Sequence, residues 1–227
     1  MKKMLAMILL MMLAVLPMAA ARGEDGTIVQ SSCSIVESGE HYLVYCFAQV
    51  HNNTDQALCL DEGTFRLIGG EETIAADEVS NLWPYFLAPG TDGYLFDIIQ
   101  FDSMPQVTGL EYDIRYLTIN PAYAGEAMET SARVELDDES GALSVVCELN
   151  NPGQTDAYDP VIAMGLYTDA GQLIYADGRN LQDVGVPAGS KLLVCFDVEY
   201  MLTEQWSSYG AVPTQVRAAT MYRTGSD

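Results

Sequence analysis

The sequence predicts an all-β protein made of two tandem antiparallel β-sandwiches, and three observations support this fold class. Apolar and polar residues alternate with the period of two that is typical of half-buried strands. Turns rich in Gly, Pro and Asn separate these short runs, and segments with a helical period are missing. Finally, the stretch "LAPGTDGYLFDI" at 87–98 is matched about one hundred positions later by "VPAGSKLLVCFDV" at 186–198.

The first sandwich is predicted for residues 27–120 and begins with a β-hairpin. Segments 27–36 and 43–52 each place a row of apolar or small residues on one face, and "ESGEH" forms the turn between them. Alternation on both sides of a Gly-bearing turn is typical of a hairpin. The strands that follow are expected in "ALCLDEGTFRLIGGEETI", "GYLFDIIQF" and "LEYDIRYLTI".

The second sandwich is predicted for residues 131–227 and repeats this order. Its strands are expected in "SARVEL", "ALSVVCELNNPG", "PVIAMGLYTDAGQLIYADG", "KLLVCFDVEY" and "TQVRAATMYR". Both second strands end in an Asn pair, and Phe96-Asp97 is matched with Phe196-Asp197. Residues 121–130, which hold a Pro, a Gly and several Ala, are predicted to be a short linker. We therefore expect the two halves to share one strand order.

One part of the second copy resembles a known family. "CELNNPG", "MGLYTDAGQLIY" and "VPAGSKLLVCFDV" follow one another as in the FxLYD-type domains of exported bacterial proteins. The motif positions are occupied by Met164, Leu166, Tyr167 and Asp169. Met stands where Phe is usual, Thr168 separates Tyr from Asp, and the first copy keeps only Phe65 and Leu67. The resemblance implies an immunoglobulin-like sandwich and supplies no catalytic residues.

The first 21 residues predict export. A basic start, an apolar run over 4–16 and the small residues Ala19 and Ala21 form the three-part pattern of a secretory signal peptide. The apolar run is shorter than the roughly 20 residues that span a bilayer. We expect an extracellular or cell-envelope protein with no membrane insertion after signal cleavage, although retention of the segment as an anchor stays open.

The charge of the chain excludes nucleic acid as a partner. The full sequence has 10 Lys and Arg against 32 Asp and Glu, a formal charge of −22. Lys2 and Lys3 are the only charged residues among the first 21, so the mature chain would carry −24. Nucleic acid binding needs Lys and Arg on the phosphates, and few are available.

Two cysteine pairs are candidate disulfides, because export permits such bonds. A two-residue turn at Gly39-Glu40 would place Cys33 opposite Cys46, at a non-hydrogen-bonded position where the Cα atoms are about 4.5 Å apart. Cys147 and Cys195 lie on strands that can meet across a sandwich core. For both pairs, reduced cysteines packed as small apolar residues are the alternative. Cys59 is left over.

Sequence motifs for chemistry are missing, so we expect no enzyme, no cofactor and no catalytic residue. There is no Gly-x-Ser-x-Gly, His-Glu-x-x-His or phosphate loop. His41 and His51 lie ten residues apart on one predicted strand, about 33 Å, and cannot share a metal ion. A weak calcium site in two acidic turns stays open, with the candidates Asp137, Asp138, Asp156 and Asp159.

Aromatic clusters are the best candidates for binding a partner. "NLWPYFLAPG" holds Trp83, Tyr85 and Phe86, and "EQWSSYG" holds Trp206 and Tyr209 in a predicted loop. Exposed aromatic rings stack on sugars or anchor a protein partner. Alternatively, these rings close the ends of the sandwiches or fill the interface between them.

From these features we expect an exported, non-enzymatic binding or structural protein of the cell envelope or extracellular space that acts through protein–protein contacts. The alternative is a carbohydrate-binding module that uses the aromatic loops, assisted by calcium.

Overall fold

The structure, a computed structural model, describes residues 26–120, 125–137, 139–210 and 212–224. The predicted signal peptide at 1–21 lies outside these residues. Within the described ranges, no helix has the length and apolar character needed to cross a membrane.

The first half of the chain folds into two antiparallel sheets. Sheet A has the order β1-β2-β7-β5, and sheet B has the order β4-β3-β6 with β8 also paired to β3. Their strands are β1 (Gly26–Ser38), β2 (His41–Asn52), β3 (Ala57–Gly69), β4 (Glu72–Glu78), β5 (Leu82–Trp83), β6 (Phe86–Leu87), β7 (Asp92–Phe101) and β8 (Gly109–Ile119).

The second half folds into two further sheets and one helix. Sheet C has the order β13-β12-β16-β9 with β14 paired to β12, and sheet D has the order β10-β11-β15. The elements are β9 (Glu126–Ala127), β10 (Glu129–Leu136), β11 (Leu143–Asn150), β12 (Ala157–Tyr167), β13 (Leu173–Asn180), β14 (Gly185–Val186), β15 (Lys191–Asp197), α1 (Tyr200–Tyr209) and β16 (Gln215–Thr224).

These sheets confirm the predicted all-β fold of two β-sandwiches. In each half, the first, second and fifth of the long strands form one sheet, as β1-β2-β7 and β10-β11-β15 show, and the remaining long strands form the other. The predicted linker is shorter than expected, because β9 and the start of β10 lie within 121–130.

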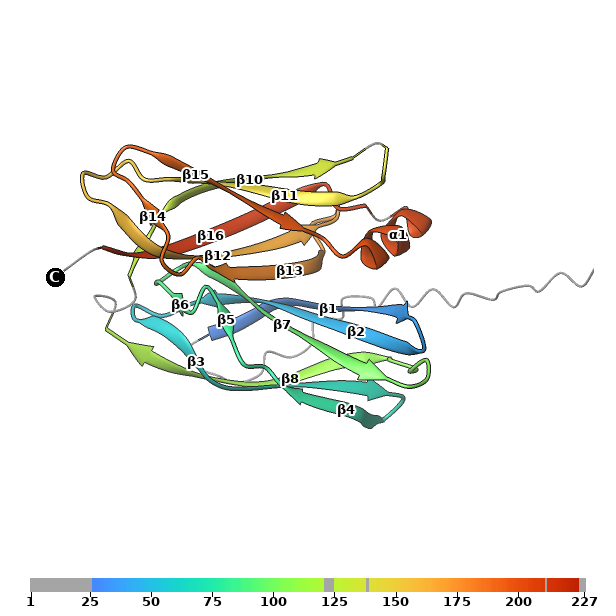
Figure 1. The fold of residues 1–227 in the computed structure, drawn as a ribbon. Coiled ribbons are helices and arrows are strands. Elements are labelled where there is room, and N and C mark those ends of the chain that lie inside the picture. Colours follow the sequence, from blue (N-terminus) through green and yellow to red (C-terminus); the bar gives the residue numbers. More distant parts are fainter. Residues whose placement is uncertain (1–25, 121–124, 138, 211, 225–227) are drawn as a thin grey trace, which may run out of the picture.

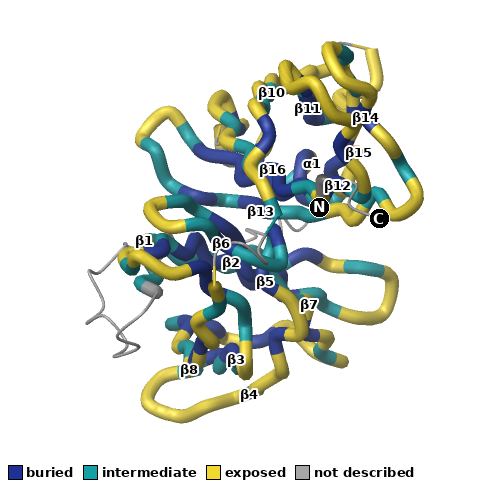
Figure 2. Tube along the Cα trace, turned by 90° about the vertical axis from the view of Figure 1, so that its left-hand side faces the viewer, coloured by how far each residue is buried: buried dark blue, intermediate teal, exposed yellow. Residues whose placement is uncertain are grey.

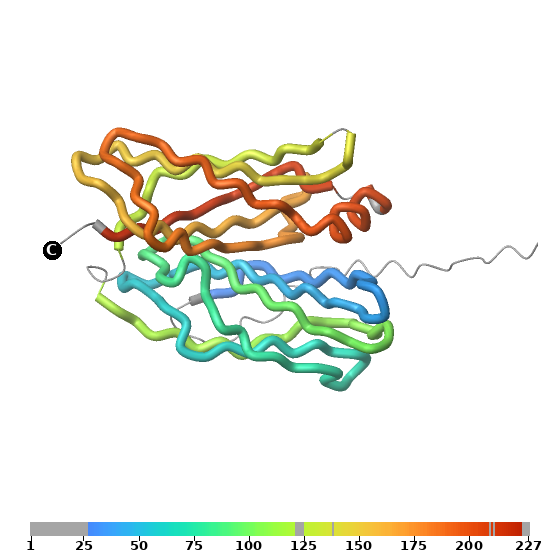
Figure 3. Tube along the Cα trace, in the orientation of Figure 1, coloured from blue at the N-terminus to red at the C-terminus, as the bar shows by residue number. Residues whose placement is uncertain are grey.

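The four sheets stack as layers in the order B, A, C, D (Figures 1 and 3). Sheet A therefore contacts its own partner B on one face and sheet C of the other sandwich on its second face. Strand β2 accordingly has consecutive buried residues from Val44 to Val50, as expected of a strand covered on both sides. By contrast, β4 at the outer edge is exposed along almost all of its length (Figure 2).

A buried asparagine builds the repeated corner in each copy. Asn52 and Asn151 are 0% and 2% exposed, and each donates from Nδ2 to two backbone carbonyl oxygens. The acceptors are Gln56 (2.8 Å) and Leu87 (2.9 Å) in the first copy, and Thr155 (2.9 Å) and Val186 (2.8 Å) in the second. Every residue of the second set lies 99 positions after its counterpart.

This spacing corrects the expected Phe-Asp match by one residue. The counterpart of Phe196 is Asp97, since Phe196 pairs with Val145 and Asp97 pairs with Cys46. Phe196 is fully buried in the core of the second sandwich, whereas Oδ2 of Asp97 has no hydrogen-bond partner. Matching the identical letters Phe-Asp in the two copies pairs residues that lie on opposite faces of their sheets. The reason is that a shift of one residue along a strand reverses the side-chain direction.

Helix α1 was not expected from the sequence, which predicted a loop there. It buries Leu202, Thr203 and Trp206, a spacing of one and four that places all three on one helical face. It ends at Gly210, whose φ of 67° is the left-handed conformation that suits glycine after a helix. One short helix within a long series of strands leaves a weak periodic signal.

Candidate functional site

Trp83 lies between the two sandwiches. Its indole ring packs on the backbone of Gly178 in β13, where an added Cβ would lie only 2.3 Å from Cδ2 of the ring. On its other sides, Trp83 contacts Tyr85 with ring centroids 4.9 Å apart and stacks on Phe96 at 6.0 Å. Of the two interpretations open for this segment, the structure favours packing between the domains over an exposed binding loop.

Phe86 and Tyr94 extend the same interface. Phe86 is half-buried against the small apolar cluster formed by Ala57 of β3 and Met221 of β16. Tyr94 is 1% exposed and lies on Gly165 of β12, where an added Cβ would meet the ring at 2.4 Å. Sheet C thus presents small residues to large aromatic residues of sheet A, and this complementarity lets the two sheets approach closely.

Polar groups are buried at the centre of the interface. Tyr94 Oη lies 3.0 Å from Tyr167 Oη, and Tyr167 donates to Gln49 Oε1 at 3.0 Å. Gln49 Nε2 in turn donates to Asp92, whose other oxygen lies 2.7 Å from Nδ1 of His51. Because buried polar groups are costly when unpaired, this chain of bonds fixes how one sandwich sits on the other.

Two glutamines hold the interface further out. Gln30 of β1 donates to the carbonyl oxygen of Gly171 at 3.1 Å and accepts from the backbone N–H of Leu173 at 2.8 Å. Gln205 of α1 donates to the carbonyl oxygen of Ile35 at 2.6 Å. These bonds join β1 to the β12–β13 turn and to the helix.

The second aromatic cluster is also internal, which corrects the prediction of a loop. Trp206 is in α1, 4% exposed, and meets Tyr175 edge-on at 6.1 Å. Tyr175 contacts Phe47 of the first sandwich at 5.3 Å, so the helix closes one end of the interface. Tyr209 is the last residue of α1, and the placement of its side chain lies outside what the structure describes.

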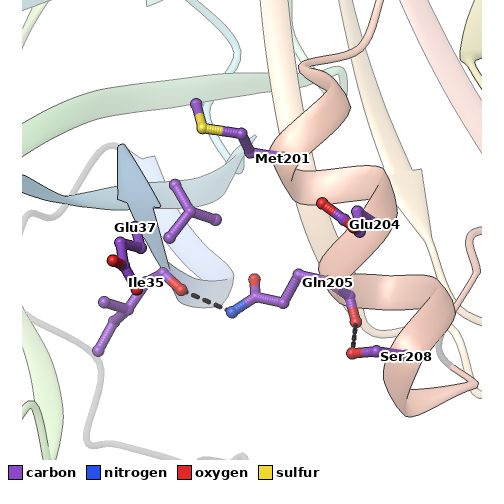
Figure 4. Close-up of a pocket in the computed structure, with 7 residues that line it drawn as sticks. Ile35, Glu37, Met201, Glu204, Gln205 and Ser208 are labelled. Carbon is purple, nitrogen blue, oxygen red and sulfur yellow. Dashed lines mark hydrogen bonds between the residues drawn. The ribbon is translucent and has the colours of Figure 1, made fainter. Parts of the chain in front are cut away.

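An open groove of about 260 Å³ runs between β1 and α1 (Figure 4). Apolar side chains and two carboxylates line it, and the Gln205–Ile35 bond crosses it. The lining residues are Ile35, Val36, Glu37, Met201, Glu204, Gln205 and Ser208.

The complementarity of sheets A and C is not repeated on the outer sheets. On sheet D, Val146 and Cys195 form the cross-strand pair that corresponds to Phe47 and Phe96 on sheet A. On sheet B, Arg66 occupies the place of Gly165 and forms an ion pair with Asp113 at 3.4 Å. The large aromatic and small residues are therefore specific to the interface and are not required by the shared fold.

The five cysteines are all free thiols in the structure. Cys33 and Cys46 lie directly opposite each other, as the two-residue turn predicted. Cys147 and Cys195 do not face each other: β11 and β15 are neighbours in one sheet, Cys147 is buried in the core, and Cys195 is exposed on the other face. The predicted meeting of these two across the core is therefore wrong.

The acidic candidates for calcium have partners within the chain. Asp137 Oδ1 accepts from the backbone N–H groups of Glu139 and Ser140, and these bonds lower its pKa. Asp156 and Asp159 each accept one backbone N–H from a distant loop, at 2.9 and 2.8 Å. Asp138 lies outside the described residues. Across the described ranges, no three His, Cys, Asp or Glu residues gather in a way that could hold a metal ion.

Of the residues at the centre of the interface, the sequence singled out Tyr167 only as a motif position, and it did not single out Gln49, Tyr94 or Gly165. A signal was available in the sequence: the stretches "VYCFAQV" at 44–50 and "IAMGLY" at 162–167 are nearly continuous apolar runs, and both are buried throughout in β2 and β12. Such continuous runs indicate strands covered on both faces.

Comparison with known proteins assigns no family to the chain. No protein-family description and no curated protein matches the chain. Among solved structures, the chain is similar to the crystal structure of red sea bream transglutaminase, at 11% identity and a TM-score of 0.25. The match covers 87% of this chain and 29% of the transglutaminase chain, so the chain spans less than a third of that protein.

Proposed function

We propose that this chain is an exported, non-enzymatic binding or structural protein in which the two sandwiches act as one rigid unit. The observation that carries the proposal is the interface between sheets A and C. It joins the domains through buried aromatic rings and a central chain of hydrogen bonds, including the 3.0 Å contact of Tyr94 with Tyr167. A rigid spacing between outer surfaces suits a protein that acts through contacts with other proteins.

The assignment of the two sandwiches to a domain type is part of the same proposal. We regard both sandwiches as immunoglobulin-like and the second as related to FxLYD-type domains. Supporting this, Phe65 and Leu67 of β3 occupy the places of Met164 and Leu166 in β12 when the copies are aligned at 99 residues. In that alignment Tyr167 of the motif is a residue of the domain interface.

The carbohydrate-binding alternative loses its main support. It depended on exposed rings, and Trp83 and Trp206 are both engaged in packing. A glycan array with the purified protein and with Trp83→Ala tests this directly. Binding that disappears in the variant, while the variant stays folded, would favour the alternative.

Export is tested by expressing the full chain in a bacterial host and fractionating the cells. We expect the protein outside the cytoplasm, with a mature N-terminus near residue 22. Accumulation of the full-length chain in the cytoplasm would contradict the proposal.

A further inference from the structure

Cys33 and Cys46 are the only two cysteines that lie opposite each other in the strand pairings of the described residues. The hairpin closes with Ser38 opposite His41, around a two-residue turn in which Gly39 has a φ of 64°. Hydrogen-bonded and non-hydrogen-bonded pairs alternate from there, and Cys33–Cys46 falls on a non-hydrogen-bonded pair. At such pairs the Cα atoms are about 4.5 Å apart, within the range that a disulfide spans.

Both side chains point into the core of the first sandwich. Cys46 is fully buried, and Cys33 packs against the same group of apolar side chains. Burial raises the pKa of Cys46, and the neighbouring Cys33 is the next largest contribution. Both thiols therefore lie on the face where a bond would be shielded from solvent.

We propose that Cys33 and Cys46 form a disulfide bond when the exported chain folds in an oxidising compartment, and that this bond joins β1 to β2. The inference rests on the proposed export. In the reaction each thiol loses a proton and one electron, and a sulfur–sulfur bond forms. The electron pair passes to an external disulfide of the thiol–disulfide oxidant class, which becomes two thiols through a mixed-disulfide intermediate.

The structure also places a limit on when the bond forms. The thiolate is the reactive species, and burial raises the pKa of Cys33 to about 11. The carboxylates of Asp97 and Asp77 further disfavour a thiolate at Cys46. Exchange is therefore slow once the sandwich has packed. The bond forms while the hairpin is still accessible and resists reduction afterwards.

The second sandwich provides a matched control. Its corresponding hairpin places Ala132, not a cysteine, opposite Cys147. Cys147 is buried in the same manner, and burial raises its pKa to about 12. Cys147 should therefore stay a thiol under conditions that oxidise the Cys33–Cys46 pair.

The test counts free thiols in the wild-type protein isolated from an exporting host without reductant. After denaturation and alkylation we expect three modified cysteines out of five, one peptide that links residues 33 and 46, and five modified cysteines after reduction. Five modified cysteines before reduction, or a bond from either residue to another cysteine, would overturn the proposal.

Refolding the reduced chain in a glutathione redox buffer separates this pairing from the question of export. A Cys33–Cys46 bond there, together with a cytoplasmic location in cells, would leave the pairing standing and reject the export. No such bond in the refolded protein rejects the pairing itself.

Stability gives an independent readout. Reduction of the wild-type protein should shift the unfolding equilibrium towards the unfolded state on the order of a hundredfold, as expected for opening a loop of this size. Cys33→Ala should make stability insensitive to reductant, whereas Cys147→Ala should leave the reductant effect unchanged. A wild-type protein whose stability does not respond to full reduction contradicts the proposal.

Discussion

The hydroxyl oxygens of Tyr94 and Tyr167 lie 3.0 Å apart although the residues belong to different sandwiches. Because Tyr167 donates its proton to Gln49 Oε1, Tyr94 is the donor in the contact between the two tyrosines, and its hydroxyl also lies 3.4 Å from the carbonyl oxygen of Arg217. Two consecutive hydrogen bonds thus orient three buried side chains from both halves of the chain. This arrangement explains why two repeated domains form a single body.

The two tyrosines should therefore contribute unequally to the unfolding free energy when each is replaced by phenylalanine. Tyr167→Phe leaves the buried Oε1 of Gln49 without its donor and should cost about 1–3 kcal/mol of unfolding free energy. Tyr94→Phe removes one donor, but the hydroxyl of Tyr167 keeps its bond to Gln49. This substitution should therefore cost only about 0.5–1.5 kcal/mol. Urea titration of both variants measures the difference. Equal, negligible losses would show that the chain of bonds is not formed.

The contact of Trp83 with Gly178 predicts a specific coupling. Trp83→Ala should cost about 3 kcal/mol, near the lower end for a large aromatic residue because Trp83 is half-buried. Gly178→Ala should also destabilise the wild-type protein, since the new methyl group would overlap the indole.

In the Trp83→Ala background, Gly178→Ala should become neutral or stabilising, because the overlap is gone and alanine suits a strand better than glycine. A double-mutant cycle measures this coupling. Simple additivity of the two losses would place Trp83 away from Gly178.

Two carboxyl groups predict how stability depends on pH. Burial raises the pKa of Asp97, with a further rise from the charge of Asp77, and burial likewise raises the pKa of Asp177. A folded-state pKa above the unfolded value means that the folded protein binds the proton more tightly. Stability should therefore increase as the pH falls from 7 through the folded pKa values towards about 4, the unfolded value.

Asp97→Asn should raise the melting temperature at pH 7 and flatten this pH dependence. Glu71→Gln removes the same charge at an exposed position and serves as the control for the high net negative charge. Equal effects of the two substitutions would mean that general repulsion, and not burial of Asp97, sets the dependence.

The asparagine corners predict matching losses in the two copies. Asn52→Ala and Asn151→Ala each remove two hydrogen bonds to backbone carbonyls, and each leaves one buried carbonyl, that of Leu87 or Val186, without its asparagine donor. Each should cost about 1–3 kcal/mol. Exposed Asn53→Ala is the control, because its bond to Thr27 lies at the surface. If a corner substitution costs no more unfolding free energy than Asn53→Ala, the asparagine does not hold the corner.

Much of the fold could be predicted from local pattern. The hairpin turn at Gly39 determined the register that brings Cys33 opposite Cys46, because a two-residue loop leaves no freedom in strand pairing. The repeated strand order followed from similar reasoning. The exact offset did not, since matching letters around Phe196 cannot distinguish the two faces of a strand.

The domain interface could be predicted only as an alternative. The residues of "NLWPYF" indicated either an exposed cluster or an interface, and the choice depended on Gly165 and Gly178, far away in the chain. Small residues that face large residues from a distant part of the chain leave no recognisable pattern in the local sequence. Helix α1 was missed for a related reason: Trp206 on its buried face packs against Tyr175, which is a tertiary contact.

Small-angle X-ray scattering of the mature protein tests the rigid joining of the two sandwiches most directly. A compact body of roughly 200 residues should have a radius of gyration of about 17 Å, with a scattering profile that matches the four-layer stack at every salt concentration. A clearly larger radius, with a profile that needs several relative positions of the two sandwiches, would contradict the rigid unit.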